Sequence, residues 1–171
     1  MFHKNIKLVI AVLIIGYAGY QFYEGYIGNG IVLIMLSLVF IFFYFRNEII
    51  LLAFLRMRKQ DLDGTHRWLG KIRNPETALT QKQQGYYNYL HGIIYSQKNL
   101  TQAEKFFRKA LKFGLNMDYD VAMAKLSLAG IALQKRRKRE ATLLLQEAKK
   151  LDKNNMLTEQ IKMMQQQMKR I

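Results

Sequence analysis

The chain contains no cysteine among its 171 residues, and this absence excludes disulfides, thiolate metal sites and cysteine nucleophiles. A single proline leaves room for long uninterrupted helices, and few segments alternate with the two-residue period of a strand. Acidic residues are also scarce, because 12 Asp and Glu stand against 27 Lys and Arg, which gives a formal net charge of +15. These shortages predict an all-α protein with a strongly basic surface.

Charge is nearly absent from the first quarter of the chain. Only three side chains within residues 1–45 are ionised, whereas residues 46–171 carry a net charge of +14. Half of all residues are hydrophobic, and the longest apolar runs lie where the charges are missing. The sequence therefore predicts two regions, an apolar helical segment at 1–46 and a basic helical domain at 47–171.

Two uncharged segments, 8–23 and 31–45, are separated by the short sequence EGYIGNG. A membrane-spanning helix needs about 20 apolar residues, and each segment approaches that length. Aromatic residues gather near the segment ends, as in an interfacial belt. These are Tyr17, Tyr20, Tyr23 and Tyr26 in the first group, and Phe42, Phe43, Tyr44 and Phe45 in the second. The pattern predicts a two-helix transmembrane hairpin in contact with a lipid bilayer.

Two alternatives to this hairpin stay open: a buried pair of soluble helices, and a signal peptide cleaved near residues 16–18. Lys and Arg flank the two segments on the outside and are missing from the loop between them. Because basic flanks stay in the cytoplasm, we expect a multi-pass protein of the plasma (inner) membrane with both termini cytoplasmic. The Lys- and Ile-rich composition favours a bacterial source. Past Arg46, the sequence leaves open whether the second helix continues unbroken into the basic domain.

The basic domain repeats a spacing of small and large apolar residues. The two copies are Ala103-x3-Phe107-x2-Ala110 and Ala141-x3-Leu145-x2-Ala148, and Gly92-x2-Tyr95 precedes the first. Small residues at fixed places let paired helices pack closely, and the apolar stripe left on each pair requires stacking. This pattern resembles the tetratricopeptide (TPR) repeat over about 85–155, with a degenerate half-repeat at 49–76 that Pro75 ends. The resemblance implies a short α-solenoid of two or three repeats, in which His91 replaces the family's leucine.

A last helix is predicted over roughly 156–171. Its apolar residues follow one another at alternating steps of four and three, and they are Leu157, Ile161, Met164, Met168 and Ile171. That spacing suits a C-terminal helix that caps the final repeat, because a solenoid needs its last face covered. The same spacing is typical of a coiled-coil seam, which would make the chain a homo-oligomer.

Catalytic motifs are missing from the sequence. The three histidines stand apart from one another, and no Gly-rich phosphate loop or nucleophile motif is present. The acidic pairs at 61–63 and 118–120 are typical of helix starts or loops. We therefore expect a protein that is not an enzyme and that uses no metal and no cofactor.

Partner binding is the function that the TPR resemblance implies. It places peptide contacts on the first helix of each repeat, at Tyr86, Tyr89, Ile93, Gln97, Met123, Leu126, Gly130 and Leu133. Tyrosine and aliphatic side chains at these positions imply an apolar helix or extended segment as the ligand, and no clamp for a terminal carboxylate. The alternative is that these residues pack against neighbouring helices.

Five consecutive cations precede the second repeated spacing: Lys135, Arg136, Arg137, Lys138 and Arg139. We expect this run at the turn between two helices, either simply solvated or in contact with anionic headgroups or an acidic partner. No aromatic groups surround the run, so nucleic acid is not an expected partner. The sequence thus favours a membrane-anchored adaptor or scaffold for an unknown protein partner at the cytoplasmic face. The alternative is a basic module that binds an anionic lipid surface.

Overall fold

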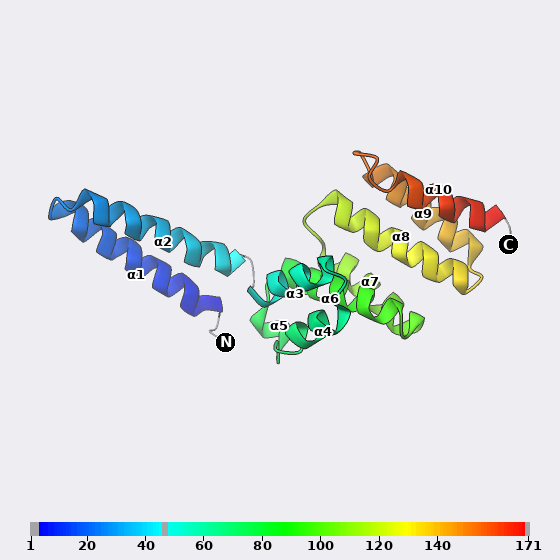
Figure 1. Ribbon diagram of the computed structural model, residues 1–171, viewed down its shortest axis with the longest axis horizontal. Coiled ribbons are helices and arrows are strands. Elements are labelled where there is room, and N and C mark those ends of the chain that lie inside the picture. Colours follow the sequence, from blue (N-terminus) through cyan, green and yellow to red (C-terminus); the bar gives the residue numbers. More distant parts are fainter. Residues whose placement is uncertain (1–3, 46–47, 170–171) are drawn as a thin grey trace.

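The computed structural model describes residues 4–45 and 48–169, and these residues form ten α-helices and no β-strand (Figure 1). The helices are α1 (Lys4–Tyr23), α2 (Ile27–Phe45), α3 (Glu48–Arg58), α4 (Leu62–Leu69), α5 (Pro75–Ala78), α6 (Gln81–Ser96), α7 (Leu100–Phe113), α8 (Asp118–Gln134), α9 (Lys138–Leu151) and α10 (Thr158–Lys169). The all-α prediction is confirmed. Whether α2 runs unbroken into α3 is a question about residues 46–47, which lie outside the described residues.

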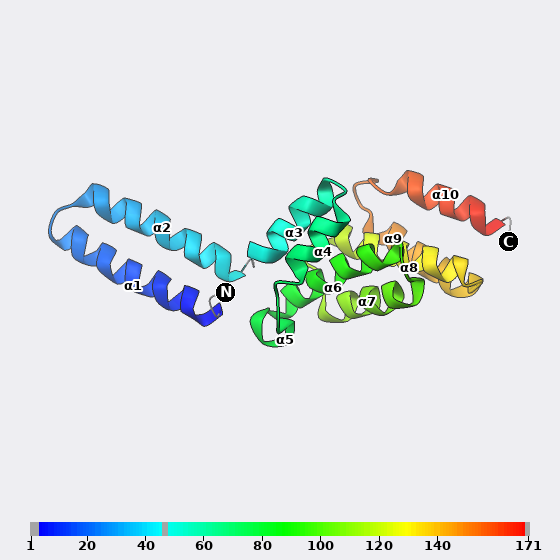
Figure 2. The same ribbon diagram turned by 60° about the horizontal axis from the view of Figure 1, so that its bottom comes forward.

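The first two helices form an antiparallel hairpin that extends away from the other helices (Figures 1 and 2). Small residues line their contact, because Ala11, Ala18 and Ser37 are each 1% exposed. A Cβ atom on Gly30 would lie 2.7 Å from the far end of the Phe22 ring, so a larger residue here would have to displace that ring. Gly25 turns the chain with a φ of +84°, in the left-handed region that glycine adopts without strain.

The hairpin corrects the predicted location. Among the described residues, no helix combines the length and the apolar character that a membrane crossing requires. The aliphatic run of α1 covers only residues 8–15, about 12 Å of helix, against a hydrocarbon layer of about 30 Å. Before this run α1 reads Lys-Asn-Ile-Lys, after it residues 16–23 include two glycines, three tyrosines and a glutamine, and the first turn of α2 contains Gly-Asn-Gly at 28–30. The transmembrane hairpin is therefore unsupported, and the multi-pass membrane location with two cytoplasmic termini is wrong.

The outer faces of the hairpin nevertheless carry large aliphatic side chains. Val12, Leu13, Val32 and Met35 are each 61 to 68% exposed. Contiguous apolar surface of this kind marks a place where another apolar surface binds.

The remaining helices form a solenoid-like stack of antiparallel pairs. Helix α3 pairs with α4, α6 with α7, and α8 with α9, while α10 lies against α8 and α9 (Figure 1). Successive apolar clusters connect the pairs, and α6 contributes to the clusters on both of its sides. Each pair is thus buried mainly by its neighbours in the chain, as in repeat proteins.

The repeated spacing seen in the sequence occupies the contacts within two of these pairs. Fully buried or nearly so are Ala103, Phe107 and Ala110 of α7, and Ala141, Leu145 and Ala148 of α9. A Cβ atom on Gly92 would lie 2.8 Å from the Phe107 ring, so a glycine in α6 is required where the large residue of α7 packs. The prediction of two closely packed helix pairs is confirmed.

The predicted half-repeat has a different end from the one expected. Pro75 begins the short helix α5 and does not end a helix. Proline is well accommodated at the first helical position, because its missing N–H has no partner there in any helix. The segment around it still belongs to the core, since Ile72 and Leu79 are buried against α3 and α4.

Helix α10 directs its apolar spacing back into the same chain. Leu157 and Ile161 are 1% and 4% exposed, and Met164 and Met168 pack half-buried beside them. Ile171 lies outside the described residues. This is the packing expected of a helix that covers the end of the stack.

Candidate functional site

A pocket of about 310 Å³ lies between α3, α6 and the start of α8. Its apolar wall includes Ile50, Leu51, Phe54, Tyr86, Met117 and Tyr119. Three of these side chains are accessible, because Leu51, Met117 and Tyr119 are 36 to 57% exposed. Concave apolar sites with a few polar groups are the usual form of a binding site, so this pocket is the strongest candidate in the described part of the chain.

Hydrogen bonds hold the polar edge of this pocket in place. The hydroxyl of Tyr86 donates to the buried carboxylate of Asp120 at 2.5 Å and accepts the backbone N–H of Asn116 at 3.2 Å. Lys82 reaches across to the carbonyl oxygen of Leu115 at 3.3 Å. These contacts join α6 to the α7–α8 connection and to the first turn of α8, so the pocket is formed before any partner arrives.

The local sequence explains why apolar side chains remain free to line the pocket. Helix α3 is apolar almost all round, and it buries Ile49, Ile50 and Ala53 in the core. Leu51 lies on another face of the same helix and is left for the pocket. At the start of α8, Asp118 and Asp120 occupy the first turn, where acidic side chains complement the positive end of the helix dipole.

The predicted groove residues do not form one surface. Tyr89, Leu126 and Leu133 are buried at 5 to 7% exposure, and burial raises the pKa of the Tyr89 hydroxyl. Half-buried are Tyr86, Ile93, Met123 and Gly130, whereas Gln97 is exposed. Tyr86 is the member of this set that lines the pocket. For most of the others, the alternative of packing between helices describes their position.

Sequence reasoning missed the contributions of α3 and of the link before α8. Residues 49–55 and 116–120 lie far apart in the sequence, and nothing in either segment indicates that they meet. One signal was available: residues 49–55 are apolar at nearly every position, which is more than a single buried face of a helix needs.

The five consecutive cations cross the turn between α8 and α9, as the sequence predicted. Two of them are neutralised within the fold, because Glu104 of α7 accepts hydrogen bonds from Lys135 at 2.9 Å and from Arg137 at 2.6 Å. Arg108 bonds to the same carboxylate and also to Glu140. Arg137 above all holds the pKa of Glu104 well below its usual range.

The other three cations of the run stay at the surface. Arg136, Lys138 and Arg139 are exposed, and no ion pair is recorded for them within residues 4–45 and 48–169. Arg136 adopts a φ of 59°, so the turn itself directs this residue away from the helix axis. The predicted anionic-surface patch is therefore split between an internal ion-pair network and a smaller exposed group.

His91 is a buried titratable group in the middle of α6. It is 7% exposed, and neither ring nitrogen has a hydrogen-bond partner. Aromatic rings surround it, with Tyr87 at 4.5 Å and Phe106 at 5.1 Å between ring centroids, and His66 at 6.0 Å. Burial, with a smaller contribution from the charge of His66, lowers the pKa of His91 to about 4.

Comparisons with known proteins add no assignment, because no family model, curated protein or solved structure matches the chain.

Proposed function

We propose that this chain is a TPR-like adaptor that binds a segment of another protein in the pocket between α3, α6 and α8. The observation that carries the proposal is a preformed apolar cavity of about 310 Å³ with accessible Leu51, Met117 and Tyr119 on its wall. Stacked helix pairs with α10 over the last pair are the architecture that such adaptors use. Binding, and not catalysis, is the proposed activity.

The chemistry of the pocket selects the ligand. Aliphatic and aromatic walls favour an apolar side chain presented by a helix or an extended segment. The rim supplies Lys82 and the buried Asp120, which can orient the polar backbone or flanking groups of that segment. Because Tyr86 and Asp120 already bond to each other, the site needs little reorganisation on binding.

Selection from a library of random peptides displayed on phage tests this function with the whole chain as bait. We expect enriched peptides that share apolar anchor positions. Their affinity should fall roughly tenfold or more in a Leu51→Asp/Met117→Asp variant, because a charge would then face the apolar anchor.

Leu143→Asp is the matched control, since Leu143 is 54% exposed on α9, away from the pocket. This change should leave peptide affinity within about twofold. Failure to enrich any peptide, or equal losses in the two variants, would contradict the adaptor function.

Binding to an anionic lipid surface is the second candidate. Two observations favour it: the exposed aliphatic faces of α1 and α2, and the exposed cations Arg136, Lys138 and Arg139. Apolar contact and basic side chains act together at such surfaces. In flotation with lipid vesicles, the chain should rise with phosphatidylserine vesicles and much less with phosphatidylcholine vesicles. Equal flotation with both would leave no role for the basic residues.

A further inference from the structure

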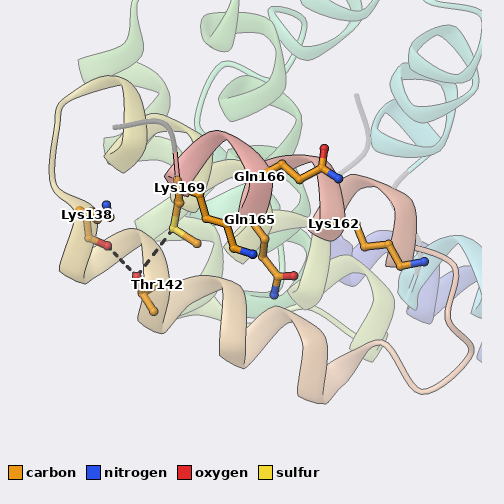
Figure 3. Close-up of a pocket in the computed structure, with 7 residues that line it drawn as sticks. Lys138, Thr142, Lys162, Gln165, Gln166 and Lys169 are labelled. Atoms are coloured by element: carbon orange, nitrogen blue, oxygen red, sulfur yellow. Dashed lines mark hydrogen bonds between the residues drawn. The ribbon is translucent and has the colours of Figure 1, made fainter.

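A second cavity lies between α9 and α10, at the opposite end of the stack from the apolar pocket. Its volume is about 460 Å³. Its lining comes from Lys138 and Thr142 on α9 and from Lys162, Gln165, Gln166 and Lys169 on α10, and Figure 3 shows Gln165 extending toward α9. The hydroxyl of Thr142 donates to the Lys138 carbonyl at 2.9 Å and contacts the Met168 sulfur at 3.7 Å, which connects the two helices beside the cavity.

The lining of this cavity is basic and carries no carboxylate among the described residues. Two lysines elsewhere on the stack have short ion pairs, Lys125 with Glu147 at 2.6 Å and Lys153 with Asp118 at 2.8 Å. Of the three lysines around the cavity, Lys162 has a single long ion pair, 3.6 Å to Glu159. The cavity therefore concentrates positive charge that the fold leaves largely uncompensated.

We propose that this basic groove, lined by Lys138, Lys162 and Lys169, binds an extended acidic segment of a partner protein. Lys162 and Lys169 are seven residues apart on α10, which separates them by about 10 Å along the helix. An extended peptide rises about 3.3 Å per residue, so carboxylates two to four residues apart reach both ends of the groove. Gln165 and Gln166 lie between the lysines and can bond to the peptide backbone.

The shape and the chemistry of the groove favour an acidic peptide over other anions. A single phosphate would neutralise one end and leave the other end charged. A flat layer of headgroups would meet the ridges of α9 and α10 before it met the cavity between them. Among the described residues that line the groove none is aromatic, so they offer nucleic-acid bases no ring on which to stack.

Fluorescence anisotropy with the full chain tests the proposal. The probe is a fluorescein-labelled peptide of alternating Glu and Ser, and the reference peptide carries Gln in place of Glu. We expect the Glu peptide to bind and the Gln peptide to bind much more weakly, with affinity falling as salt rises. A Lys138→Gln/Lys162→Gln/Lys169→Gln variant should weaken binding by about tenfold or more.

A charge-matched control separates the groove from the overall basic character of the chain. Lys105, Lys109 and Lys112 are exposed on α7, so a Lys105→Gln/Lys109→Gln/Lys112→Gln variant loses the same charge elsewhere. Binding to this control should stay within about twofold of the unmodified chain. All six lysines are exposed, and an unchanged circular dichroism spectrum checks that both variants fold.

Three outcomes would overturn the proposal: no binding of the Glu peptide, equal loss in the two triple variants, or displacement of the peptide by inorganic phosphate or phosphatidylserine vesicles at matched anion concentration. The groove and the apolar pocket share no residue, so either proposal can fail without the other.

Discussion

Glu104 is the acceptor on which the charge balance of the α8–α9 turn depends. It is 14% exposed at its side chain and binds Lys135, Arg137 and Arg108. Because the pKa of this carboxyl is lowered in the folded protein, its ion pairs stabilise the fold fully at pH values above about 4.5, the ordinary pKa of the unfolded chain. This stabilisation is lost as the pH falls below that value. A partly buried carboxylate that binds three cations contributes more to stability than an exposed ion pair does. Removal of the carboxylate would leave the three positive charges next to one another.

We therefore expect Glu104→Gln to lower the free energy of unfolding by about 1–2 kcal/mol at neutral pH. Glu147→Gln is the control, because Glu147 is 52% exposed and binds Lys125 alone. That change should cost less than about 0.5 kcal/mol. Urea denaturation of both variants measures the difference, and similar costs would show that the Glu104 network contributes no more than a surface pair.

His91 introduces a second dependence on pH. Its folded-state pKa of about 4 lies below the ordinary value of 6.5, so the unfolded chain binds a proton first. Above about pH 6.5, His91 is neutral in both the folded and the unfolded chain and does not lower stability. As the pH falls from about 6.5 towards 4, the unfolded chain is protonated first and the free energy of unfolding decreases.

Between pH 8 and pH 5, we expect His91 to reduce the free energy of unfolding by about 2 kcal/mol. A His91→Leu variant should lose less stability over the same interval, because leucine does not titrate. Urea denaturation of both proteins at the two pH values gives the comparison. Glu104 contributes little above pH 5, and a parallel loss in the two proteins would exclude His91 as the source.

At the scale of the helices, close packing depends on where glycine stands. Gly92 and Gly130 are both helical, but they face different neighbours. A Cβ on Gly92 would meet the buried Phe107 ring at 2.8 Å, whereas one on Gly130 would meet the flexible end of Met164 at 3.4 Å. The ring is held on all sides and cannot move aside.

We expect Gly92→Ala to destabilise the stack by about 1–3 kcal/mol through overpacking. Gly130→Ala should be neutral or stabilising by up to about 1 kcal/mol, because alanine is the better helix former. Thermal unfolding followed by circular dichroism distinguishes the two. A stable Gly92→Ala protein would mean that α6 and α7 pack less closely than described.

The two repeated helices and their buried contacts could be predicted, because the same short spacing of small and large apolar residues occurs twice in the sequence. The small–large–small spacing placed α7 and α9 and their buried residues, and the cation run marked the turn before Lys138. The pocket could not be predicted, because α3 and the start of α8 meet only after the pairs stack. The Glu104 network was hidden for the same reason, since Lys135 lies on a different helix pair.

For the molecule as a whole, the hairpin and the stack are built separately. Among the side chains that the structure describes, none of α1 or α2 belongs to the apolar clusters of the stack. A hydrogen bond of 3.4 Å joins the two parts, from the Gln83 amide to the carbonyl oxygen of Tyr44. The exposed aliphatic surface belongs to the hairpin. Removal of the hairpin should therefore abolish apolar surface binding without lowering the stability of the stack.

We expect a chain that begins at residue 48 to unfold cooperatively with a midpoint close to that of the full chain. The same truncation should remove most binding of an apolar dye such as ANS, because Val12, Leu13 and Val32 are deleted with the hairpin. Thermal unfolding and ANS fluorescence measure the two effects. Loss of cooperativity in the shorter chain would show that the hairpin supports the stack.

Helix α8 has a place in the stack that no other helix shares. Its residues enter three apolar clusters: Ala124, Leu128 and Ile131 in one, Ala122, Leu126 and Ala129 in the next, and Ala132 and Leu133 in the last. A helix held from so many sides opens only when α7, α9 and α10 have all separated from it. The backbone amide protons of α8 should therefore exchange with solvent more slowly than those of α4 or α10. We expect α8 to be the last of these helices to open.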